Sequence, residues 1–129
     1  MARYGAGVSR SGVNTANTAY FNLDNTGSTQ RLVVRQVIVN VSVAPTTAPM
    51  FYLARTTARG TQSSTLAGLP FDENDAAALG TLDVCGTGGS QPTFTNTAWL
   101  TTGALATTAG GAFIWTFYDA PIIVSASSG

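Results

Sequence analysis

The sequence contains no histidine and no lysine, and it has a single cysteine, Cys85. Without histidine, neither a Ser–His nor a Cys–His nucleophilic couple can form, and zinc loses its usual imidazole ligands. One cysteine excludes an intrachain disulfide and a cysteine-rich metal site, so we expect Cys85 to be an unreactive thiol in the core or in a loop. We therefore expect no catalytic residue, no metal, no cofactor and no enzymatic activity.

Charged side chains are also scarce. They make up 9% of the 129 residues and sum to a formal net charge of +0, whereas about a quarter of the residues of an ordinary soluble domain are charged. A net charge near zero favours association, and a neutral Thr, Ser, Asn and Gly surface loses little free energy when another protein covers it. The composition favours a chain that works inside a protein assembly, with a monomer of low charge as the alternative.

The sequence lacks the signals that are typical of chains that bind membranes or nucleic acids. No apolar run approaches the ~18 residues of a membrane helix, and the N-terminus has no apolar signal-peptide core. The basic residues form no cluster of the kind that binds nucleic acid. We therefore expect no membrane, nucleic-acid or small-molecule partner. All six basic residues are arginines spread along the chain: Arg3, Arg10, Arg31, Arg35, Arg55 and Arg59.

The length of the chain fits one domain preceded by an arm. Residues 1–17 are small, polar and glycine-rich without periodicity, which is typical of a flexible N-terminal arm. Residues 18–129 are then expected to form a single domain, since 129 residues leave little room for a second one.

Alternation of apolar and polar side chains predicts about seven short strands. The clearest is the β-branched run from Arg31 to Val43, whose phase changes near Arg35 and Gln36. Such a change indicates a bulge or a strand buried on both faces. The pattern as a whole is typical of a β-sandwich or barrel. Further strands are expected at 19–23, 50–55, 81–84, 93–100, 112–118 and 122–124.

Acidic residues followed by alanines and a glycine occupy 72–80 and predict one or two helical turns capped at both ends. The carboxylates of Asp72, Glu73 and Asp75 are either a calcium site or the acidic start of that helix. We favour the helix start, because Ala76 stands where calcium would need an oxygen ligand. The loop at 86–89 matches no phosphate-binding motif and is expected to be only a loop.

Two groups of side chains are candidates for binding. Phe113, Trp115 and Phe117 share one face of a predicted strand and form either a core seam, which we favour, or a platform for sugar rings. Arg55 and Arg59 follow a strand closely and are candidates for an interface with carboxylates of a neighbouring subunit, or for a solvated loop face. Arg3 and Arg10 are further interface candidates in the arm.

Three segments carry a resemblance to a known family: Leu53–Thr56, Asp72–Ala77 and Gly110–Phe117, within residues 31–124. The order of these segments resembles that of the small jelly-roll cement or decoration proteins of tailed-phage virions. The resemblance implies an all-β, antiparallel, jelly-roll-like β-sandwich with one short helical segment. It also implies a capsid-stabilising protein without catalytic residues, made in the host cytoplasm and located on the capsid exterior. Its partners would be itself, as a homotrimer, and the major capsid or another virion protein.

Two other functions remain open. A glycan- or receptor-binding module of a phage tail or secreted protein would expose Trp99 or Trp115 in a groove. A major shell subunit, in contrast to an accessory protein, would form closed particles when expressed alone.

Overall fold

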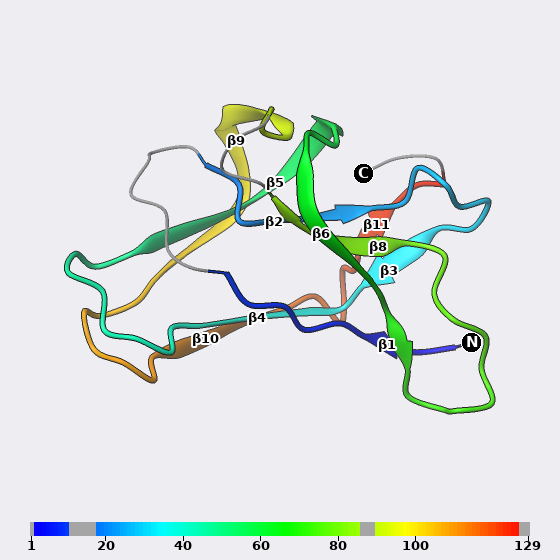
Figure 1. Cartoon of the computed structure of the whole chain (residues 1–129), viewed down its shortest axis with the longest axis horizontal. Coiled ribbons are helices and arrows are strands. Elements are labelled where there is room, and N and C mark those ends of the chain that lie inside the picture. The colour runs from blue at the N-terminus through cyan, green and yellow to red at the C-terminus, as the bar shows by residue number, and fades with distance from the viewer. Residues whose placement is uncertain (1, 11–17, 86–89, 127–129) are drawn as a thin grey trace. The chain divides into compact units, whose positions relative to one another are not determined.

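The structure of the chain, a computed structural model, describes residues 2–10, 18–85 and 90–126, without the side chains of 95–98. All regular structure in these residues is β-strand (Figure 1). No helix long and apolar enough to cross a membrane occurs among them. Every strand pair with a determined register runs antiparallel. The predicted all-β class is confirmed.

Residue contacts divide the chain into two compact units. The first unit comprises residues 1–32, 56–94 and 124–129, and the second unit comprises 33–55 and 95–123. A single domain over residues 18–129 stays a prediction. Of the predicted arm, residues 2–10 are described and contain the short strand β1 (Tyr4–Gly5), whereas 11–17 lie outside the described residues.

The first unit is built on a three-stranded antiparallel sheet with the strand order β2-β8-β6. Its strands are β2 (Phe21–Asp24), β8 (Thr81–Cys85) and β6 (Gln62–Ala67). A second pair in this unit joins β1 to β7 (Leu69–Pro70), with Gly5 opposite Leu69.

Polar side chains of β2 and β8 are buried in this sheet. Successive side chains of a strand alternate between faces, and on β2 the polar Asn22 and Asp24 are 6% and 4% exposed, whereas the apolar Phe21 is 41% exposed. Asp83 lies opposite Asn22 on the same face and is fully buried. The core of the first unit is therefore organised around carboxylate and amide groups as well as around Val84, Cys85 and Val124.

The second unit contains the ribbon of β4 (Gln36–Asn40) and β10 (Ala112–Thr116), in which Ile38 lies opposite Ile114. Two further strand pairs occur among the described residues. One pair joins β5 (Met50–Ala58) to β9 (Thr93–Ala104), and the other joins β3 (Leu32–Val34) to β11 (Ile122–Val124).

An aromatic cluster occupies one face of β10. Phe113 and Trp115 are half-buried while Ile114 between them is exposed, so the predicted alternation is confirmed. The ring of Phe113 lies 4.7 Å from that of Trp115 and 6.0 Å from that of Phe51, measured between centroids. Gly103 of β9 leaves room for the Phe113 ring, because a Cβ at that position would lie 2.7 Å from two of its carbons.

The helix predicted for 72–80 is wrong. Asp72 forms a local turn instead: its Oδ1 accepts the backbone N–H of Asn74, and its carbonyl accepts the N–H of Asp75. The N–H of Ala78 then donates to the distant carbonyl of Gly68 rather than to one four residues earlier. A side chain that offers the backbone a turn competes with the costly first turn of a helix, and so short a segment cannot offset that cost.

The structure also differs from the predicted strands at two places. At Arg35, where the alternation changes phase, the chain leaves β3 and begins β4, and these strands pair with different partners. The phase change thus marks a switch between sheets rather than a bulge or a doubly buried strand. The segment 56–70, in which the sequence predicted no strand, contains the end of β5 and strands β6 and β7. The predicted loop at 86–89 lies outside the described residues.

Replacing Gly103 with alanine tests the packing of the aromatic cluster. The added methyl group would overlap the Phe113 ring, so we expect Gly103→Ala to lower the free energy of unfolding by about 1–3 kcal/mol, as overpacking does. Urea unfolding measures the change. Gly27→Ala is the control, because a Cβ at Gly27 meets nothing within 4 Å. Equal stability of the two variants would contradict the packing.

Candidate functional site

A buried cluster of polar side chains joins the residue after β5 to strands β8 and β2 of the first unit. The Arg59 guanidinium binds the Asp83 carboxylate in a bidentate manner, with Nε at 2.7 Å from Oδ2 and Nη2 at 2.8 Å from Oδ1. Its Nη1 lies 3.4 Å from Oδ2 of Asp24. The Asp83 side chain is fully buried, the Asp24 side chain is 5% exposed and that of Arg59 is 33% exposed. One cation thus neutralises one of two buried carboxylates.

The backbone around Arg59 positions the guanidinium. Arg59 directly follows β5, and Gly60 then turns the chain into β6 with a φ of 73°. A Cβ at Gly60 would lie 2.5 Å from the backbone nitrogen of Pro92, so the two segments approach at a distance that only glycine permits. The N–H of Thr61 donates to the carbonyl of Ser90 at 2.7 Å and holds this approach.

Hydroxyl groups also donate to the two carboxylates, although Oδ1 of Asp24 is buried without a hydrogen-bond partner. Thr81 Oγ1 donates to Oδ1 of Asp83 at 3.0 Å, and Thr26 Oγ1 donates to Oδ2 of Asp24 at 2.8 Å. The hydrogen bonds that the Arg59 guanidinium donates to the Asp83 carboxylate raise the pKa of Arg59 above its ordinary value. Because the guanidinium and hydroxyl donors engage both carboxylates, the arrangement favours holding β2, β8 and the end of β5 together over proton transfer.

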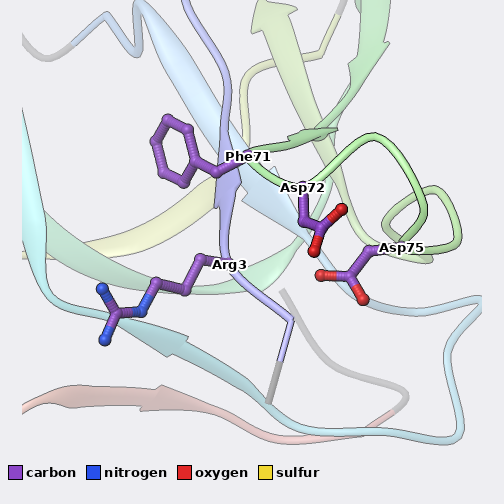
Figure 2. A pocket seen from close by; sticks show the side chains of 4 residues that line it. All are labelled: Arg3, Phe71, Asp72 and Asp75. Atoms are coloured by element: carbon purple, nitrogen blue, oxygen red, sulfur yellow. The ribbon is translucent and has the colours of Figure 1, made fainter.

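The acidic turn lines a pocket on the same unit. Arg3, Phe71, Asp72 and Asp75 surround about 280 Å³ (Figure 2). Figure 2 shows the Arg3 guanidinium extending away from both carboxylates. No group of three or more His, Cys, Asp or Glu side chains that could hold a metal occurs within the described ranges.

The four arginines predicted as interface residues lie in different surroundings. Arg59 makes the bidentate contact expected of it, but with a carboxylate of its own chain. Arg10 donates to the carbonyl of Ala19 and lies over the ring of Tyr20, 5.6 Å from its centroid. Arg55 is exposed and donates to the carbonyl of Ile123 at 3.0 Å. Exposed Arg3 lines the pocket. Interface contacts with another subunit stay a prediction for all four.

The single thiol is buried beside the cluster. Cys85 is 1% exposed, and this burial raises the pKa of its thiol. A raised pKa lowers the thiolate fraction, so the environment favours an inert core thiol.

The roles of Asp24 and Asp83 were not predicted from the sequence. Asp83 lies inside a predicted strand and Asp24 at the end of another, where each resembles an ordinary solvent-facing or turn residue. Their partner, Arg59, is 24 residues from Asp83 in the sequence. Only the pairing of β2 with β8 brings the two carboxylates together.

No protein-family model matches the chain, and the comparisons with curated proteins and with solved structures also find no match.

Removal of the Arg59 guanidinium is expected to destabilise the first unit. Arg59→Met leaves the fully buried Asp83 carboxylate without its counter-ion, and breaking a buried ion pair costs about 3–5 kcal/mol. We expect about 3 kcal/mol, the lower end, because Arg59 itself is partly exposed. Urea unfolding measures the loss.

Arg31→Ala serves as the control for that measurement. Arg31 is exposed, and its removal should change stability by less than about 0.5 kcal/mol. If Arg59→Met unfolded at the same urea concentration as Arg31→Ala, the buried ion pair would not stabilise the fold.

Proposed function

We propose that the chain is a virion structural protein, a capsid cement or decoration protein that stabilises a shell through subunit–subunit contacts. It associates with copies of itself and with the major capsid or another virion protein on the capsid exterior. Each contact made only in the assembled state stabilises that state by mass action. Its domain is a jelly-roll-like antiparallel β-sandwich, and the all-β antiparallel pairing of the described strands supports this part of the proposal.

One observation carries the proposal: no described side chain of the second unit is buried. Isolated two-stranded ribbons are at best marginally stable in water and need a further layer to cover an apolar face. The second unit exposes eight large apolar side chains, which another subunit could remove from water. These side chains are Val33, Ile38, Val43, Met50, Tyr52, Leu100, Ile114 and Tyr118.

The low charge of the chain supports the same function. Burying charged side chains at an interface is costly, whereas covering neutral polar and apolar groups costs little and removes apolar surface from water. With 9% charged residues and a net charge of +0, two copies meet without net repulsion. A surface of this kind suits permanent subunit contacts better than a free, dispersed monomer.

The alternative of a glycan-binding module receives less support. Trp99 and Trp115 are both half-buried, and neither is among the exposed large apolar side chains. The ring of Trp99 lies against that of Tyr52, with 4.5 Å between centroids. A flat platform for a sugar ring requires an open aromatic face.

The mass of the purified chain in solution tests self-association. Light scattering across a hundredfold range of concentration should give about 40 kDa, three times the 13.2 kDa of the chain, or a multiple of that mass. A mass of one chain at every concentration, with cooperative unfolding, would contradict the proposal.

Immunogold electron microscopy tests the location. Antibodies raised against the purified chain should label the outer shell of virus particles produced from the genome that encodes it. Label confined to tails would favour the receptor-binding alternative, and particles without label would exclude a virion protein.

A further inference from the structure

β10 has one edge without a partner. Among the strands that the structure describes, β10 pairs with β4 alone. Its side chains Ala112, Ile114 and Thr116 are exposed, and Ile114 is 54% exposed. An unpaired edge is a template for another strand, and proteins usually protect it with charged side chains or proline. β10 contains neither.

The hydrogen bonds at the two ends of the ribbon show which backbone groups face this edge. The N–H of Phe117 donates to the carbonyl of Arg35, and the N–H of Val41 donates to the carbonyl of Gly111. In an antiparallel pair, hydrogen-bonded and non-hydrogen-bonded positions alternate. The odd-numbered residues of β10 therefore bond to β4, and the N–H and C=O groups of 112, 114 and 116 point toward the free edge.

We propose that β10 pairs antiparallel with β10 of a second copy of this chain, around a twofold axis at Ile114. This pairing rests on the proposed self-association and names one contact through which the copies would associate. Ile114 would exchange both backbone hydrogen bonds with Ile114 of the partner subunit, and Ala112 would do the same with Thr116 of the partner subunit.

The sequence of β10 is complementary to itself in this register. Phe113 faces Trp115 of the partner subunit at a non-hydrogen-bonded position, where side chains are closest and aromatic pairs stabilise a sheet. On the opposite face, Ile114 meets its own copy and continues the row that begins with Ile38, which is 58% exposed. The pairing thus extends the ribbon into a four-stranded sheet, which is large enough to be stable in water.

The charge pattern favours a second copy as the partner. β10 and β4 carry no charged side chain, so the edge offers nothing to recognise an acidic or basic protein, and identical edges meet without repulsion. The outer edge of β4 likewise has no partner strand within the described residues, but self-pairing there would place Val37 opposite Val39 of the partner subunit and form no aromatic pair. The copies inside a closed trimer are related by a threefold axis, whereas this contact needs a twofold axis. The contact would therefore join a copy from one trimer to a copy from another.

Two matched proline variants test the pairing. Proline lacks the N–H, and the N–H of Ile114 points away from β4, so Ile114→Pro removes a bond across the proposed contact but none within the ribbon. Ile38→Pro makes the same change on the opposite edge of the same ribbon. By light scattering, Ile114→Pro should halve the mass of the assembly and Ile38→Pro should leave it unchanged. Far-ultraviolet circular dichroism checks that both variants fold.

Cross-linking gives an independent measurement. In a Cys85→Ala background, Ile114→Cys places two thiols opposite each other with Cα atoms about 5.5 Å apart, within disulfide range. Mild oxidation should give a covalent dimer on a non-reducing gel, and Ile38→Cys should not. If the wild-type chain associates but the Ile114 variants behave like the Ile38 variants, the β10 pairing is wrong and the self-association stands. A wild-type monomer at all concentrations would overturn both.

Discussion

Few apolar side chains are fully buried in the part of the chain that the structure describes, and this small core determines how the fold is held together. Its buried apolar side chains among the described residues are Val84, Cys85 and Val124, all in the first unit. Because apolar burial is the main favourable contribution to folding, a chain with so small a core has little stability in reserve. The exposed isoleucines, tyrosines and valines of the second unit are the surface from which additional stability can come, once another subunit covers them.

The first unit compensates for its small apolar core with a polar one. The bidentate contact between Arg59 and Asp83 joins the end of β5 to the middle of β8, and Asp24 adds the end of β2. Ion pairs in such positions contribute less net stability than apolar packing, but they are strongly directional and leave few alternative arrangements. The cluster therefore fixes β2, β8 and the end of β5 relative to one another.

The sequence predicted the features that depend on local pattern and missed those that depend on distant partners. The alternation of side chains around Phe113 and Trp115 identified β10 and its two faces, because successive side chains of a strand point to opposite faces of the sheet. The acidic stretch at Asp72 was misassigned, because its side chain bonds to the local backbone instead of starting a helix. The carboxylates of the buried cluster could not be recognised, because strand pairing brings them to Arg59 and pairing leaves no local signal.

Amide hydrogen exchange measures directly whether other subunits protect the second unit, as we propose. Exchange rates would be compared between dilute and concentrated protein for β10 and for β8, the central strand of the first unit. Exchange reports the free energy of local opening, which association raises only where the contact lies. We expect the amides of β10 to become more protected as the concentration rises, while the protection of the β8 amides stays unchanged. Equal protection of β10 at every concentration would contradict this proposal.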